Sequence, residues 1–220
     1  MDQQFLTLIA NGTLETIQMT LISTGISYLF GVPLGVLLYI TGRDGIAPNA
    51  VVNAVVGVIV NVLRSVPFLI LLVAILPFTR LVVGTTIGSA ATIVPLVVAA
   101  SPYVARMVES SLKEVDPGVV EAARAMGTNM MQMVTKVFLP EARPSLLIGA
   151  AISLATILGY SAMAGFVGGG GLGAIAINYG YYRYQTDVML ITVILLVIIV
   201  QIFQEGGLKL ASKLDKRLKN

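Results

Sequence analysis

The sequence predicts an all-α integral membrane protein with about five transmembrane helices. Mean hydropathy is +0.90 over the 220 residues. Apolar residues make up 56% of the chain and charged residues only 11%, where soluble domains carry about 25% charged residues. A hydrocarbon core of ~30 Å requires about 20 apolar residues per helix, so a chain of this length holds roughly five or six spans joined by short loops.

The composition also excludes several kinds of chemistry. The chain has no cysteine, histidine or tryptophan, which removes thiolate nucleophiles, disulfides, histidine-bound metals and imidazole bases. We therefore predict no catalytic site and no metal site. The net charge of +3 is better explained as a membrane topology signal than as a nucleic-acid footprint, so no nucleic-acid partner is expected.

Each span is predicted from a window without charged residues. The first window follows Glu15, with no basic segment before it and no small-residue cleavage site after it, so we predict an uncleaved helix. The next two windows are separated only by Arg64 and predict one tilted helix. The window over 144–182 is too long for one span, so we divide it into a helix, a glycine-rich loop and a short helical piece near 174–182. The predicted spans are residues 16–42, 52–79, 85–108, 144–164 and 187–205.

The basic residues predict the orientation. An odd number of spans places the termini on opposite sides, and eleven of the fourteen Lys and Arg residues then fall on the side of the 106–143 tract and the C-terminus. Only Arg80 and Arg183 fall on the other side. The positive-inside rule therefore predicts an external N-terminus and a cytoplasmic C-terminus. Leucines at four-residue spacing and lysines in the tail, residues 207–220, predict an amphipathic helix on anionic lipid.

Arg64 is the one ionisable residue well inside a predicted span, a placement that is costly in hydrocarbon and typical of function. It either faces a pathway or lies near the inner interface, where its side chain reaches the headgroups. The length of the segment before it favours the interface.

The cytoplasmic loop, residues 113–140, carries the clearest motif. Asp116, Pro117 and Gly118 are typical of a helix start, and Gly127 is typical of a residue that ends a helix. Glu121 and Arg124 lie opposite a narrow apolar stripe on this helix. The stripe consists of Val119, Ala122, Ala123 and Met126.

Two small alanines in this stripe would allow a close approach to a partner surface. Asn129 and Gln132 predict the cap of a second helix, which runs to Leu139 and Pro140. The pattern alone favours an ordinary interfacial hairpin over a docking helix.

The residues of this loop resemble a known family. The run over 121–140 is EAARAMGTNMMQMVTKVFLP. It resembles the EAA loop of ABC-importer permeases, which has Glu-Ala-Ala, three residues, Gly, nine residues, an aliphatic residue, any residue and Leu-Pro. Val137 stands where isoleucine is usual. The rest of the chain is similar to methionine-importer permeases from end to end, through RSVPFLILLVAILPFTR (64–80), SPYVARMVESSL (101–112) and GYSAMAGFVGGGGLG (159–173).

The resemblance implies a type I ABC importer permease fold, with five transmembrane helices per subunit in a bacterial inner membrane. It implies a homodimer around a central pathway, two ATPase subunits, and an external lipid-anchored binding protein that delivers methionine in its D-form, its L-form or both. In that family the EAA helix docks in a cleft of the ATPase. The implied coupling residues are Val119, Glu121, Ala122, Ala123, Arg124, Met126, Gly127, Leu139 and Pro140.

The same resemblance implies that this chain is a transport subunit and not an enzyme. The sequence agrees, because it lacks the Gly-x-x-x-x-Gly-Lys-Ser/Thr pattern of a nucleotide site. We therefore expect no cofactor in this chain, with ATP and Mg²⁺ bound by the partner ATPase.

The glycine-rich run over 165–173 allows two interpretations. A phosphate loop is rejected, because the run has no Lys or Arg and follows no strand. Glycine permits a turn whose backbone comes close to its neighbours. Alternatively, the run lets the fourth helix bend while Met163 closes the pathway, flanked by Tyr160, Ser161 and Gly165.

Other functions remain open on the residues alone. A permease for another amino acid or a quaternary amine has the same overall pattern. From another class, a proton-coupled carrier is disfavoured because the predicted spans hold no Asp, Glu or His between their terminal residues. A sodium-coupled carrier or a channel would use backbone carbonyls and is not excluded.

Overall fold

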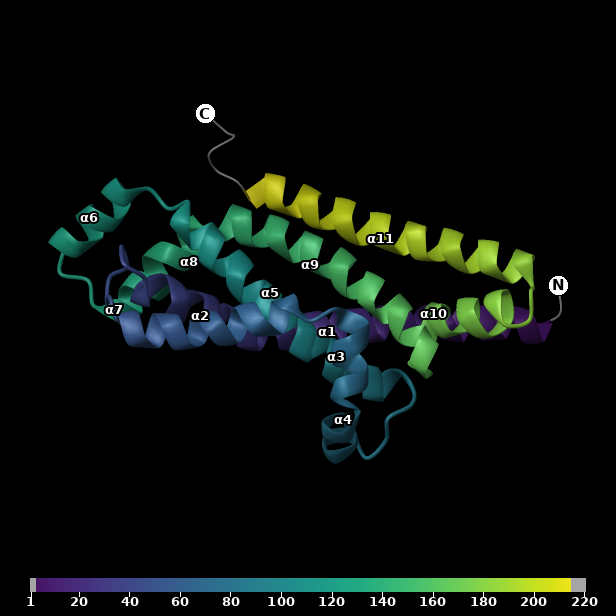
Figure 1. Cartoon of the computed structure of the whole chain (residues 1–220). Helices are drawn as coiled ribbons and strands as arrows, with labels where there is room; N and C mark the ends of the chain where they lie inside the picture. Colours follow the sequence, from purple (N-terminus) through teal and green to yellow (C-terminus); the bar gives the residue numbers. More distant parts are fainter. Residues whose placement is uncertain (1–2, 215–220) are drawn as a thin grey trace.

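The computed structural model describes residues 3–214 as an elongated bundle of helices (Figure 1). Helix α1, Gln3–Thr41, runs along most of the long axis. Helix α5, Ser89–Lys113, packs against α1, and α9, Arg143–Ala164, packs against both α5 and α11, Thr186–Leu214. The remaining elements are α2 (Ala50–Ser65), α3 (Phe68–Ala74), α4 (Leu76–Val83), α6 (Pro117–Ala125), α7 (Met130–Gln132), a π-helical segment (Met133–Phe138), α8 (Leu139–Glu141), a 3₁₀ turn (Gly165–Val167), α10 (Gly171–Ile175) and a second π-helical segment (Ala176–Tyr181).

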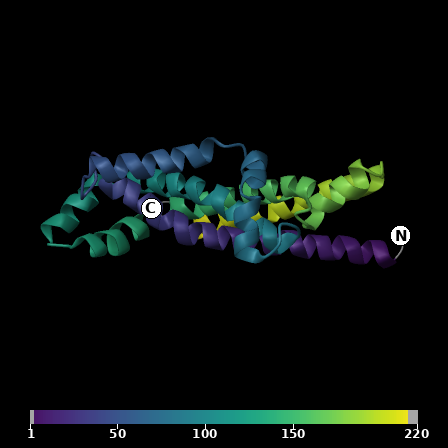
Figure 2. The same ribbon diagram turned by 60° about the horizontal axis from the view of Figure 1, so that its bottom comes forward.

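The structure and the predicted class agree. Within the described residues, four helices are long and apolar enough to cross a membrane, and the bent pair α2 and α3 makes a fifth candidate. Helix α1 starts at one end of the long axis, and α11 ends on the other side of its middle (Figure 2). Helices α6, α7 and α8 cap the end toward which α11 runs, and α10 lies at the other.

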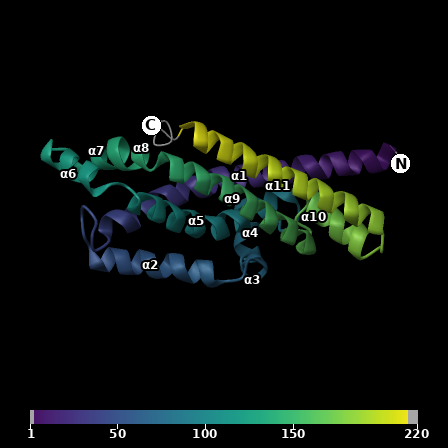
Figure 3. The ribbon, with the colours of Figure 1, turned by 90° about the horizontal axis from the view of Figure 1, so that it is seen from above.

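The prediction of one tilted helix over 52–79 is wrong. Helix α2 ends at Ser65, and α3 leaves it at an angle of 102° (Figure 3). Pro67 explains the break, because proline lacks an N–H and pushes the residue before it out of the helical region. Val66 accordingly has extended angles, φ −78° and ψ 125°.

Helices also extend beyond the predicted spans. The first begins at Gln3 rather than near residue 16, and α5 continues to Lys113. At 1.5 Å per residue, the 39 residues of α1 measure about 58 Å, nearly twice the ~30 Å hydrocarbon thickness. The predicted tail over 207–220 continues α11 without a break as far as Leu214, and the rest of it lies outside the described residues.

Helices α1 and α5 approach each other closely at two glycines. A Cβ on Gly31 would lie 2.6 Å from Val104 Cγ1, and a Cβ on Gly35 would lie 2.5 Å from the carbonyl oxygen of Ala105. Glycines four residues apart are the usual means by which membrane helices bring their backbones together. This contact, which our reading of the sequence missed, fixes α5 against α1.

Candidate functional site

Helix α6 begins and ends as its sequence predicts. The Asp116 carboxylate accepts a hydrogen bond of 2.7 Å from the Gly118 N–H, and Pro117 occupies the first helical position. Gly127 follows the helix with φ +77°, a conformation that favours glycine. At the start of α7, Asn129 Oδ1 accepts from the Gln132 N–H at 2.9 Å, and Gln132 Oε1 accepts from the Asn129 N–H at 3.1 Å. This is the predicted capping box.

The tract from α6 to α8 is anchored in the body of the bundle. Ala123 is only 3% exposed and belongs to a core cluster with Val108 and Leu112 of α5. Phe138 is fully buried in the same cluster and meets the Tyr39 ring of α1 edge-on, with the ring centroids 5.0 Å apart. A force on α6 therefore reaches α1 and α5 through packed side chains.

The nine predicted coupling residues do not share one surface. Ala123 faces the core of its own chain, and Leu139 is half-buried. Met126 is 77% exposed. The other exposed members are Val119, Glu121, Ala122, Arg124, Gly127 and Pro140. The exposed stripe residues Val119, Ala122 and Met126 are accessible to a partner, whereas Ala123 is not.

Sequence reasoning missed two further exposed residues beside Met126. Met130 and Met131 are 50% and 70% exposed at the start of α7, just beyond the Gly127 turn. We call Met126, Met130 and Met131 the methionine patch. Methionine adapts its shape to an irregular partner, and exposed apolar patches mark interaction sites. The signal was present in the sequence, because three of the chain's nine methionines fall within six residues.

A charged groove of about 640 Å³ separates α6 from the end of α1. Its lining includes the cations Arg43, Lys113 and Arg124 and the anions Asp44, Glu109 and Glu121. Glu121 and Arg124 thus line this groove on the inward side of α6.

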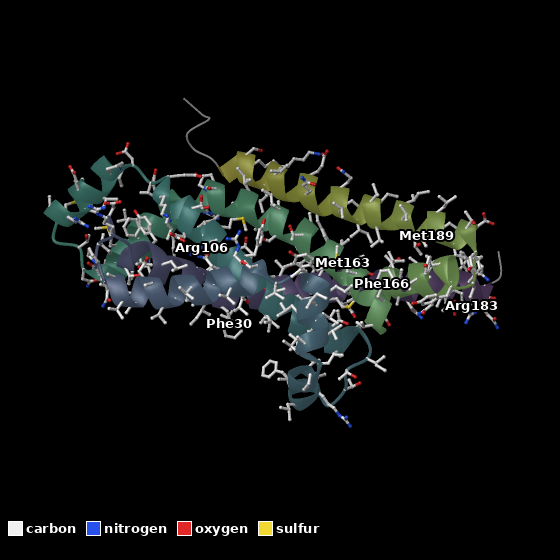
Figure 4. The ribbon with its side chains drawn as sticks, in the orientation of Figure 1. Phe30, Arg106, Met163, Phe166, Arg183 and Met189 are labelled. Carbon is white, nitrogen blue, oxygen red and sulfur yellow. The ribbon has the colours of Figure 1, made fainter. Side chains whose placement is uncertain are left out.

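In the groove, Glu109 orients an arginine that joins α5 to α2. Its carboxylate pairs with Arg106 at 2.6 Å and with Lys113 at 2.8 Å. Arg106, labelled in Figure 4, also donates to Asn61 Oδ1 of α2 at 2.9 Å. The hydrogen bond from Arg106 to Asn61 therefore holds α2 against α5.

The glycine-rich run is a turn with close backbone approaches. Gly168, Gly170 and Gly171 have φ of +78°, +79° and +68°. The Thr92 hydroxyl donates to the Gly169 carbonyl oxygen at 3.0 Å, and the Gly88 N–H donates to the Gly168 carbonyl oxygen at 2.9 Å. The run therefore ties the end of α9 to the start of α5.

An acidic side chain occupies the anion position at the start of α10. The Gly171 N–H donates to Glu15 Oε2 at 2.7 Å, and the Leu172 N–H donates to Thr16 Oγ1 at 2.8 Å. These are the N–H groups that a phosphate would need, so the geometry supports the rejection of a phosphate loop.

Two acidic residues lie in the parts of α1 and α5 that extend beyond the predicted spans. Glu15 lies in α1 and Glu109 lies in α5, because both helices extend past the charge-free windows. Glu15 binds the start of α10, and Glu109 binds two cations. Both acids already have structural partners, which disfavours either as a proton relay.

We predict that Glu15→Ala lowers the stability of the chain by about 0.5–2 kcal/mol, the range for loss of a helix cap. The Gly171 N–H would lose its acceptor, whereas Glu15→Gln keeps an oxygen at the same place and should lose less. Thermal unfolding of the two purified variants in detergent measures the difference. If the alanine variant is as stable as the parent, the Glu15 cap does not stabilise the start of α10.

The predicted gate residues, all near the end of α9, have different surroundings. The Tyr160 ring stacks on Phe68 of α3, with centroids 4.6 Å apart and planes 6° apart. Ser161 is buried and donates to the Leu158 carbonyl oxygen at 2.8 Å, and Gly165 is buried against the backbone of Gly173. Met163 is 47% exposed on α9 (Figure 4). Of the four residues, Met163 has the side chain that is exposed and can contact another chain or the pathway.

Arg64 lies in the last turn of α2, beside a hollow that Phe68, Tyr103 and Tyr160 also line. At 1.5 Å per residue it stands about 21 Å from the start of the helix at Ala50. Helix α2 starts at the end of the bundle near α6 and runs to its middle (Figure 1). The interfacial placement of Arg64 that the sequence favours stays a prediction, and the helix end at Ser65 gives Arg64 a second possible role.

Comparison with known proteins gives consistent results. Residues 31–206 match the family described as binding-protein-dependent transport system inner membrane component. The probable D-methionine transport system permease protein MetI of Vibrio cholerae serotype O1 is 48% identical over 210 residues, covering 96% of this chain and 93% of that protein. The D-methionine transport system permease protein MetI of Escherichia coli K12 is 50% identical over 165 residues, covering 75% of this chain and 76% of that protein.

Solved structures agree. A chain of the inward-facing MetNI methionine ABC transporter superposes with a TM-score of 0.96 at 48% identity, covering 98% of this chain and 100% of that chain. An amino acid ABC transporter structure has a TM-score of 0.78 at 20% identity, which shows a shared fold.

Proposed function

The chain belongs to the family of binding-protein-dependent transport system inner membrane components, and from this membership we propose that it is the membrane-spanning permease subunit of an ATP-driven methionine importer. It is a multi-pass protein of a bacterial inner membrane. It forms the pathway for D-methionine, L-methionine or both, and a separate chain hydrolyses ATP. The observation that carries the proposal is the likeness to methionine-transporter permeases over nearly the whole chain, in sequence and in fold.

The assembly is a permease dimer with two ATPase subunits. Five helices line at most one wall of a pathway wide enough for an amino acid, which favours a two-fold dimer. We further propose that an external methionine-binding lipoprotein delivers the substrate. Exposed apolar residues on α9, among them Ile148, Ile152 and Met163, offer a face for the second copy.

The α6–α7 hairpin is the proposed contact with the ATPase. Support comes from its place at one end of the bundle, from the exposed stripe residues Val119, Ala122 and Met126, and from the methionine patch. Its anchorage through Ala123 and Phe138 would transmit a movement of the ATPase to α5 and α1.

Uptake into proteoliposomes tests the function. Vesicles that contain the permease, its ATPase and the binding protein should accumulate radiolabelled methionine when ATP is present and ion gradients are dissipated. Uptake driven by a sodium or proton gradient without ATP would favour the carrier alternative. If ATP drives uptake of another amino acid or a quaternary amine but not of methionine, the proposed substrate is wrong.

The proposed orientation has a direct test, because the chain has no native cysteine. Lys136 and Tyr182 are both exposed and lie between the predicted spans, on opposite sides of the predicted topology. A membrane-impermeant maleimide applied to spheroplasts should label Tyr182→Cys and spare Lys136→Cys. The reverse labelling would place the α6–α7 hairpin outside and rule out its contact with a cytoplasmic ATPase.

Met163 is proposed to close the resting pathway, because its side chain is exposed on α9 close to the glycine-rich turn. Met163→Ala should raise ATP-independent methionine leak from loaded vesicles, since it removes most of the side chain. Met163→Leu conserves the volume and should keep the seal. If both variants leak no more than the parent, the constriction lies elsewhere.

A further inference from the structure

The bend between α2 and α3 holds an arginine that has no partner among residues 3–214. Arg64 is exposed in the last turn of α2, and it makes no hydrogen bond or ion pair with any residue from 3 to 214. Arg106, by contrast, binds Glu109 and Asn61. An unpaired guanidinium within a span is costly, so its retention in the middle of the bundle indicates that an anionic group from outside the chain meets it.

A small hollow of about 160 Å³ lies beside this arginine. Its walls combine Arg64, the tyrosines Tyr103 and Tyr160, and Phe68. The space is several times the ~30 Å³ share of one water and below the ~300 Å³ of the smallest drug-sized pockets. It therefore suits a small molecule that carries an anionic group.

The backbone adds a second polar element. Helix α2 stops at Ser65 and Val66 is extended, so the chain has an interrupted helix at this point. The last carbonyl groups of a helix lack intrahelical partners and carry the negative end of its dipole. In membrane transporters such interruptions serve to hold charged parts of a substrate. An ammonium group is favoured at this helix end.

The stacked pair Phe68 and Tyr160 supplies an aromatic wall on the third side. Aromatic rings make favourable contacts with thioether sulfur, especially at the ring edge. The hollow therefore offers a cation, a negative helix end and an aromatic wall within one small space. These three features complement the α-carboxylate, the α-ammonium and the side chain of methionine.

We propose that this hollow is a transit site for the amino acid within the membrane. Arg64 binds the α-carboxylate, the carboxyl end of α2 attracts the α-ammonium, and the Phe68–Tyr160 pair contacts the side chain. The inference rests on the proposed function, because it takes the substrate class from there. It adds a recognition site inside the permease and a specific role for Arg64.

Saturation-transfer NMR can measure this binding, because the method detects weak ligands. The purified permease–ATPase complex in nanodiscs, without the binding protein, is titrated with L-methionine. Arg64→Gln should weaken binding by about ten- to a hundredfold, the loss expected for a hydrogen bond to a charged group. Arg80→Gln is the matched control, because Arg80 is an exposed arginine of α4 that does not line this hollow.

Two ligand comparisons test the assignment without relying on one variant. L-Methioninamide, which lacks the carboxylate, should bind the parent complex more weakly than L-methionine, and Arg64→Gln should remove this preference. Norleucine replaces the sulfur by a methylene group, and Phe68→Leu should reduce any preference for methionine over it. Each variant is first checked for ATPase binding and normal elution.

The outcomes separate the two proposals. If the complete parent system shows no ATP-driven methionine uptake, the proposed function fails. If uptake is normal but L-methionine binds the parent and Arg64→Gln equally, or binds neither, the transit site is overturned. If the transit site is overturned, Arg64 is instead expected to pair with the second copy of the chain or with a lipid phosphate.

Discussion

Ala123→Asp is expected to unfold the α6–α7 hairpin, whereas Ala122→Asp, one residue earlier, should leave the hairpin folded. Ala123 is 3% exposed and packs in the cluster that contains Leu112, Met133 and Phe138. A carboxylate there would be an uncompensated buried charge, with a loss of at least ~3 kcal/mol. Ala122 is exposed, so its aspartate remains in water until a partner covers it.

Limited proteolysis and ATPase co-purification distinguish the two variants. Ala123→Asp should expose the hairpin to protease in the isolated permease. Ala122→Asp should resist protease as the parent does but retain less ATPase on an affinity column, because docking would desolvate the new charge. Parent-like ATPase retention by Ala122→Asp would remove that face of α6 from the proposed contact. Protease resistance of Ala123→Asp would contradict the anchoring role of the core.

The ends of α6 followed from the sequence because capping is local chemistry. Asp116, Pro117 and Gly127 act within one turn of the helix that they start or stop. Which residues of the α6 stripe face the core could not be predicted in the same way. Adjacent alanines differ by 100° around a helix, and which of them becomes buried depends on where α5 and Phe138 lie.

That the chain has four or five spans was also predictable, since length and hydropathy limit the count. The break at Pro67 was visible in the sequence but was missed, because windows defined by charge ignore proline. The cap of α10 is a different case. Glu15 and Gly171 are 156 residues apart, and no local pattern joins them. The glycine run indicated a close approach, but only the fold identifies Glu15 and Thr16 as its partners.

Arg64 shows how a residue can be found from sequence while its place in a helix is not. Its charge within an apolar segment indicated function at once. Its place within the helix did not follow, because the charge-free windows predict a helix that runs on to residue 79. Once α2 ends at Ser65, the same residue stands at a helix end in the middle of the bundle, beside Tyr103 and Tyr160.

Gly35→Leu is expected to destabilise the chain strongly, while Gly25→Leu in the same helix should not. A Cβ at Gly35 would lie 2.5 Å from the Ala105 carbonyl oxygen and 2.6 Å from Val108 Cβ. The first of these atoms is backbone, so α1 and α5 would have to separate along their contact. Overpacking of this kind costs typically 1–3 kcal/mol, and a rigid backbone neighbour places the loss at about 3 kcal/mol or more.

Gly25 is the matched control, because nothing lies within 4 Å of a Cβ built there. Leucine at that position should be neutral or stabilise the helix by up to about 1 kcal/mol, the propensity difference from glycine. Size-exclusion chromatography of heated, fluorescently tagged variants in detergent ranks their stabilities. If Gly35→Leu survives heating as well as Gly25→Leu, the close contact of α1 with α5 does not hold the bundle together. If both variants fail equally, the Gly25 face of α1 must also be packed, which the single chain does not provide.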